Sequence, residues 1–137
     1  MEFFQDPEKR FMIPELFSEK ASAEAKKIRD SDLKSNQFRN YFQELRAMEE
    51  SFRRNGGAKS EAAWNYLLPR LHMLKARVAY GRRKNGSTTL QFQVFMNEVI
   101  DSGTRSPKDF EAMMLYVEAV LAYFYAEENK SGEFRRR

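Results

Sequence analysis

The sequence has no cysteine and a single histidine, His72, among its 137 residues. Without cysteine there is no disulfide framework, no thiolate nucleophile and no Cys-based zinc or iron–sulfur site, which fits a reducing cytosol. His72 falls off the apolar stripe of its predicted helix and near no other metal ligand, so a surface position is favoured. We therefore expect a cytoplasmic protein without a metal or cofactor.

Long apolar runs are also missing. The longest, residues 113–117, is far shorter than the roughly 20 residues that a membrane span requires. Residues 1–10 carry several charges and no apolar run behind them, so we expect no signal peptide. These two features predict a protein that makes no use of a membrane.

Groups that could catalyse a reaction are scarce. The acidic pairs Glu49-Glu50 and Glu127-Glu128 are adjacent in sequence, so each pair splays around its helix and is interpreted as part of a solvated face. Gly56-Gly57 precedes Ala58-Lys59-Ser60, but the first glycine and the preceding strand of a phosphate-binding loop are absent. We do not expect an enzyme.

Large apolar side chains are plentiful, with 12 Phe and 42% hydrophobic residues, so the chain should fold. Apolar residues recur at helical spacing between turn signals at residues 55–57, 85–87 and 101–103. The expected fold class is all-α, a compact helical bundle of about five helices. Their predicted bounds are 14–29, 32–54, 60–84, 88–100 and 106–128. As domains we expect an N-terminal extension (1–31, partly helical), the bundle (32–128) and a basic, flexible tail (129–137).

Local signals refine these helices. Ser31 or Asp32 can cap the second helix and Ser60 the third, while Ser106 followed by Pro107 suits the start of the fifth. Pro69 predicts a kink or a break in the third helix. The fourth segment alternates in part like a strand, but a lone strand would have nothing to pair with, so we predict a helix.

Basic residues form rows at seven-residue steps, close to two helical turns. One row is Arg39, Arg46 and Arg53; the other is Arg70, Arg77 and Lys84, beside Tyr66, Met73, Tyr80 and Arg83. The first could follow successive phosphates, and the second could also stack bases. The alternative is a pair of solvated helix faces with acidic partners one turn away, such as Glu44, Glu49 and Glu50. The net charge of +4 does not decide between them.

Lys75 and Arg82 stand out because they follow Leu68 at seven-residue steps. This places them on the side of the helix that carries Trp64 and Leu71. Since burying two cations in a core is costly, they either extend to water along packed stems or face a polyanion.

Three stretches of the chain carry recognisable motifs. They are residues 35–42, with Gln37-Phe38-Arg39; residues 71–82, with Leu74-Lys75-Ala76-Arg77; and residues 110–124, with Glu118-Ala119 and Ala122-Tyr123-Phe124. Together these stretches resemble the Csm small-subunit family of type III-A CRISPR effector complexes. Their order and spacing cover the chain from residue 32 to residue 128. Nothing before residue 32 matches.

The resemblance implies a non-catalytic subunit of an antiviral ribonucleoprotein, present in several copies along its filament. Its partners would be guide RNA, target RNA, other Csm subunits and copies of itself. Matching positions imply RNA contacts for a set of five residues: Arg39, Lys75, Arg77, Tyr80 and Arg82.

Two other functions stay open: an assembly protein that uses its Phe- and Met-rich C-terminal helix, and a small helical DNA-binding regulator. RNA binding predicts that Lys75, Arg77 and Arg82 share one exposed surface with Arg39. A scattered placement favours assembly alone.

Overall fold

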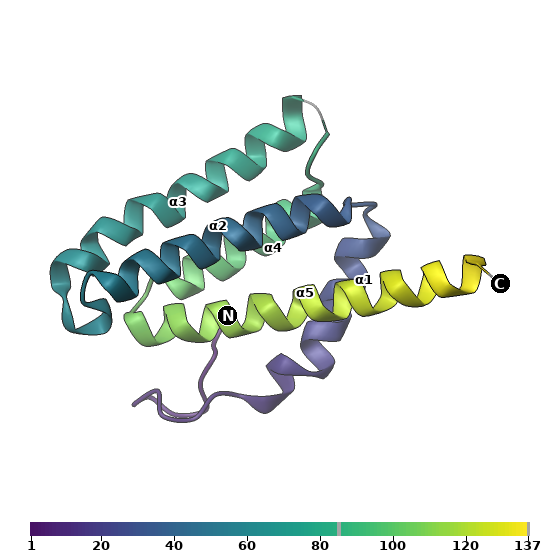
Figure 1. The fold of residues 1–137 in the computed structure, drawn as a ribbon. Helices are drawn as coiled ribbons and strands as arrows, with labels where there is room; N and C mark the ends of the chain where they lie inside the picture. Colours follow the sequence, from purple (N-terminus) through teal and green to yellow (C-terminus); the bar gives the residue numbers. More distant parts are fainter. Residues whose placement is uncertain (85, 137) are drawn as a thin grey trace.

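The computed structural model describes the backbone of residues 1–84 and 86–136 and the side chains of residues 1–84 and 86–127. Within these residues it contains five α-helices and no strand, which confirms the expected all-α class (Figure 1). The helices are α1 (Glu19–Asp30), α2 (Ser35–Arg54), α3 (Glu61–Lys84), α4 (Leu90–Gly103) and α5 (Pro107–Arg136), with 3-10 turns at Pro14–Phe17 and Gly57–Lys59. None of the described helices is both long and apolar enough to cross a bilayer.

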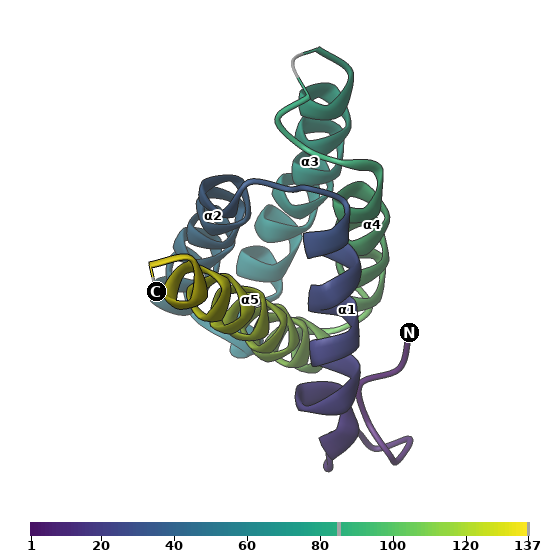
Figure 2. The ribbon, with the colours of Figure 1, turned by 90° about the vertical axis from the view of Figure 1, so that its right-hand side faces the viewer.

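The helices surround one core (Figure 2). Helix α5 packs against α1, α2 and α4, while α3 packs against α2 and α4. Phe38 of α2 joins three of these helices, because its ring centroid lies 5.2 Å from that of Phe92, 5.9 Å from Phe95 and 5.4 Å from Phe124. All four rings are buried, so aromatic packing holds α2, α4 and α5 together.

The described Phe and Met side chains of α5, up to residue 127, point inward. Phe110, Met113, Met114 and Phe124 are each at most 3% exposed. These side chains are therefore used within the chain, and an assembly role would have to rest on other residues.

Two of the predicted caps are confirmed. The Ala63 backbone N–H donates to the Ser60 hydroxyl at 3.0 Å, and the Asp109 N–H donates to the Ser106 hydroxyl at 3.1 Å. Pro107 occupies the first position of α5. Each hydroxyl thus satisfies one of the backbone donors that a helix start leaves open.

The predicted cap of α2 by Ser31 or Asp32 is wrong. Helix α2 begins at Ser35, and no side-chain cap bond forms at the preceding residue, Lys34. The Ser31 hydroxyl instead donates to the Ile28 carbonyl at the end of α1, and Asp32 takes a left-handed φ of 66°. Both residues therefore belong to the turn that ends α1.

The fourth segment is a helix, as predicted, and Thr89 caps it by accepting the Phe92 N–H at 3.3 Å. The break considered at Pro69 does not occur, since α3 continues through it (Figure 1). Pro69 is exposed, so water can bond to the carbonyl that its missing N–H leaves free.

The N-terminal segment packs on the bundle. Phe3 and Leu16 are buried in the same core, and Phe4 pairs with Met12 in an antiparallel bridge. The division into an extension (1–31) and a bundle (32–128) stays a prediction. The predicted tail, 129–137, lies outside the residues whose side chains are described.

Helix α4 packs closely against Met113 of α5 at Gly103. We therefore expect Gly103→Ala to lower the free energy of unfolding by about 1–3 kcal/mol. An added Cβ would lie 2.9 Å from the Cβ of Met113, which is fully buried. Urea denaturation measures the loss. Gln91→Ala, at an exposed position of α4, is the control and should be near neutral; an equal change in both variants would contradict the clash.

Candidate nucleic-acid interface

One face of α3 alternates aromatic or Met side chains with cations. We call this set the α3 stripe: Tyr66, Arg70, Met73, Arg77, Tyr80 and Lys84. Steps of four and three residues keep all six on one side of the helix, over about 27 Å of its length. All six are exposed, and Tyr66, Met73 and Tyr80 are each about 60% exposed. Large side chains exposed along one line make this side of α3 a candidate binding surface.

The core of α3 explains this placement. Its buried line includes Leu67, Leu71, Leu74 and Val78, and each stripe residue from Tyr66 to Arg77 precedes one of them by one position. The stripe therefore lies about 100° around the helix from the core line, beside it and at the surface.

Two cations of the stripe rest on its tyrosines. The Arg70 guanidinium lies 3.4 Å from the Tyr66 ring centroid and donates to the Tyr66 carbonyl at 2.9 Å. The Lys84 ammonium lies 5.3 Å from the Tyr80 centroid. Within the described part of the chain neither forms an ion pair with a carboxylate, so both charges are available to an anion.

Arg77, the third cation, pairs with Glu44 of α2, and the Tyr41 hydroxyl donates to the Arg77 carbonyl at 3.4 Å. Burial raises the pKa of Tyr41, with smaller opposing effects of Arg77 and Glu44, so this tyrosine stays a neutral donor. Arg77 is half exposed, and a surface ion pair of this kind contributes little. A polyanion can therefore compete with Glu44 for it.

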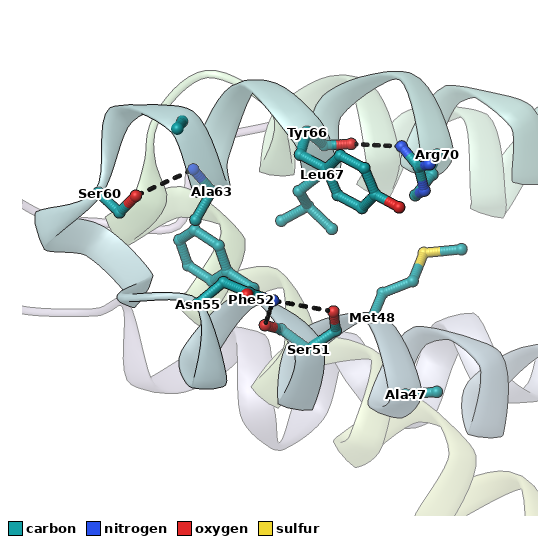
Figure 3. A pocket seen from close by; sticks show the side chains of 11 residues that line it. Ala47, Met48, Ser51, Phe52, Asn55, Ser60, Ala63, Tyr66, Leu67 and Arg70 are labelled. Atoms are coloured by element: carbon teal, nitrogen blue, oxygen red, sulfur yellow. Dashed lines mark hydrogen bonds between the residues drawn. The ribbon is translucent and has the colours of Figure 1, made fainter.

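A groove of about 600 Å³ runs between α2 and α3 beside the first half of the stripe. Met48 and Phe52 of α2 line one side of the groove, and Tyr66 and Leu67 of α3 line the other (Figure 3). Arg70 lies at its edge. This volume falls in the range of small-molecule sites, roughly 300–1,000 Å³. Sequence reasoning missed the groove, because helical spacing does not show which apolar residues of α2 and α3 line a hollow between the two helices.

A second hollow, beside Arg77, is lined by the side-chain amides Gln37, Asn40 and Gln43. These three were not predicted as site residues either. Their spacing of three residues along α2 places each within one turn of the next on the helix surface, and that spacing is the signal that could have found them.

The Arg39 row runs along the seam between α2 and α5, where Arg39 and Arg46 contact residues of α5. Arg39 donates from Nε to the Tyr125 hydroxyl at 2.9 Å, and its guanidinium lies 5.2 Å from the Tyr125 ring centroid. Arg39 is thus held against α5 and does not face α3.

Glu49 organises the rest of that row. It lies 3.2 Å from Arg46 and 3.4 Å from Arg53, and Arg46 also reaches Glu118 of α5 at 3.3 Å. Glu49 is buried, so its interpretation as part of a solvated face is wrong: two arginines enclose it, which lowers the cost of burying its charge. Of the other predicted solvated pair, Glu127 is exposed and Glu128 lies outside the described side chains.

Lys75 turns to a third side, toward α4, where its ammonium lies 2.5 Å from the Asp101 carboxylate. Its side chain is only 27% exposed, so its stem packs while its charge reaches a partner. Arg82 and Arg83 are exposed at the end of α3. The single surface expected to join Lys75, Arg77 and Arg82 with Arg39 is therefore not formed, and for these residues the scattered placement favours assembly. An RNA-binding surface would have to rest on the residues of the α3 stripe instead.

A family model described as Csm2 Type III-A matches residues 13–130 of the chain. The chain belongs to this family. It is therefore a small subunit of type III-A Csm effector complexes. The comparisons with curated proteins and with solved structures gave no match.

The extent of the match corrects one expectation. It begins at residue 13, whereas the motif resemblance found nothing before residue 32. The turn at Pro14–Phe17 and helix α1 therefore lie within the region that this Csm2 chain shares with its family. Among its described residues no group of three or more His, Cys, Asp and Glu side chains is placed to hold a metal.

Proposed function

We propose that this Csm2 chain is a non-catalytic subunit that binds the backbone of guide and target RNA without reading sequence. It works in the cytoplasm and packs along the effector filament beside other Csm subunits and copies of itself. The observation that carries the proposal is the α3 stripe, in which two cations have no carboxylate partner among the described residues and a third forms an exposed ion pair.

The geometry of the cations suits phosphates. Arg70, Arg77 and Lys84 follow one another at about 10 Å along the helix axis, so they can follow a strand without fixing its bases. Contacts of Arg and Lys to phosphates position a nucleic acid but do not specify its sequence. In RNA-guided effectors the specificity comes from base pairing with the guide, and a subunit of this kind needs none of its own.

Packing along the filament has separate support. Leu90 and Val94 lie one turn apart on α4 and are each more than half exposed. These residues lie outside the α3 stripe, so contacts between subunits need not compete with RNA. If the stripe binds no RNA, this face would carry an assembly role alone.

Replacing Arg70, Arg77 and Lys84 together by glutamine should weaken binding to a mixed-sequence single-stranded RNA by about tenfold or more at low salt. The slope of log affinity against log salt should fall by about 2, because each lost phosphate contact removes about 0.7. Fluorescence anisotropy at several salt concentrations measures both quantities, with circular dichroism as the check of fold.

The matched control replaces Lys20, Lys26 and Lys27 of α1 by glutamine. These lysines are exposed, and the variant changes the net charge by the same amount, so it should keep most of the affinity. Equal losses in the two variants would contradict the stripe as the interface. Absence of salt-sensitive binding by the wild type would contradict RNA binding by this chain and favour assembly.

A further inference from the structure

We propose that the α3 stripe selects single-stranded RNA over duplex, by stacking unpaired bases on Tyr66 and Tyr80 and seating one base in the groove between α2 and α3. The inference rests on the proposed function, since it names the form of RNA that the stripe binds. This mode of binding differs from binding to the RNA backbone alone, because stacked bases add affinity. It still does not distinguish one base from another.

The aromatic half of the stripe is the first argument. Tyr66 and Tyr80 are each about 60% exposed, as is Met73 between them. Phosphate binding would need only the cations of the stripe. Small polar side chains at the positions of Tyr66, Met73 and Tyr80 would then be sufficient. An exposed tyrosine ring offers a flat face on which any base can stack. Because the Arg70 guanidinium covers one face of Tyr66, a base would stack on the other face of that ring.

The order of the residues is the second argument. Along the stripe each cation is followed or preceded by an apolar side chain, so a base stacked on Tyr66 would have Arg70 beside its phosphate. The same holds for Tyr80, which has Arg77 and Lys84 one turn away on either side. Base faces and phosphates alternate along a single strand in the same way.

The groove is the third argument. Its walls are apolar, formed by Met48, Phe52 and Leu67, and Tyr66 and Arg70 stand at its rim (Figure 3). Asn55 and Ser51 supply polar groups at one end. This composition fits an RNA base, which is a flat and partly polar ring. The base would lie between the apolar walls, with the Arg70 cation beside its phosphate.

A duplex could not use these features. Its bases are already stacked and paired, and the major groove of A-form RNA is too deep and narrow for side chains to read. Tyr66 and Tyr80 would meet only sugars and phosphates, and the groove would stay empty. The contribution of the tyrosines therefore distinguishes the two forms of RNA.

The experiment compares three ligands of equal length by anisotropy: a single strand, the corresponding duplex, and a strand whose residues lack bases. The wild type should bind the single strand about 10- to 100-fold tighter than the abasic strand, as stacking of one or two bases implies. The variant Tyr66→Ala/Tyr80→Ala should lose that advantage and keep its affinity for the abasic strand. Tyr66→Phe/Tyr80→Phe, which keeps both rings, should behave as wild type.

Phe11→Ala/Tyr123→Ala removes two exposed aromatic side chains off the stripe and is the matched control, expected to leave all three affinities unchanged. Equal affinity of the wild type for the single and abasic strands, or for the duplex, overturns this inference and leaves backbone binding intact. If the wild type binds none of the three ligands, the proposed function fails and this inference with it.

Discussion

Phe38→Ala is expected to lower the free energy of unfolding by about 3–5 kcal/mol, the usual cost of removing a buried phenyl ring. Phe38 is 1% exposed and meets three other rings, on α4 and α5. The cavity would open where three helices converge, and neighbouring rings fixed in a dense core cannot close it. Because a domain of this kind is stable by only about 5–15 kcal/mol, a large part of its stability should be lost.

Chemical denaturation followed by circular dichroism measures this loss. Phe11→Ala is the control, because Phe11 is 60% exposed and its ring should contribute little. A change of similar size in both variants would show that Phe38 does not hold the helices together. Phe38→Leu, which refills much of the space, should recover part of the loss.

Lys9→Met is expected to lower the free energy of unfolding by about 2–4 kcal/mol, because it leaves a buried carboxylate without its cation. Lys9 pairs with Asp109, which is 1% exposed. After the replacement, Asp109 would keep the Ser106 hydroxyl at 2.7 Å but no positive charge. Methionine preserves the length of the side chain, so the change isolates the charge.

A double-mutant cycle with Asp109→Asn tests the pair. The two replacements should couple by about 1–3 kcal/mol, as residues in direct contact do. Arg10→Met is the control, since Arg10 pairs with Asp6 at an exposed position and should cost at most about 1 kcal/mol. Additive effects of Lys9→Met and Asp109→Asn would contradict the assigned ion pair.

Periodicity along the chain predicted the elements well. Helical spacing indicated α2, α3 and α5, and Ser60 and Ser106 start their helices as predicted. The spacing left α4 ambiguous, and it was predicted as a helix because a lone strand would have nothing to pair with. These features depend on residues within one or two turns of each other, so sequence contains nearly all of the information. The alternation of Tyr66, Arg70, Met73 and Arg77 on one face follows from the same rule.

Contacts between helices could not be predicted in this way. Glu49 is buried because Arg46 and Arg53 enclose it, and Lys75 turns away from Arg77 because Asp101 lies across from it on α4. Each outcome depends on which helix packs beside the residue and on how the two helices are rotated about their axes. Periodicity within a single helix carries no information on either.

The sequence by itself determined that this protein is all-α, where most of its helices run, and that one side of α3 alternates cations with tyrosine and methionine. It also carried the family resemblance, through motifs that each lie within one helix. Only the tertiary structure decided which basic residues share a surface, and that a groove opens between α2 and α3 beside Tyr66 and Arg70. The physical reason is that helix formation is governed by local bonds and spacing, whereas ion pairs, burial and grooves arise from the packing of helices far apart in the chain.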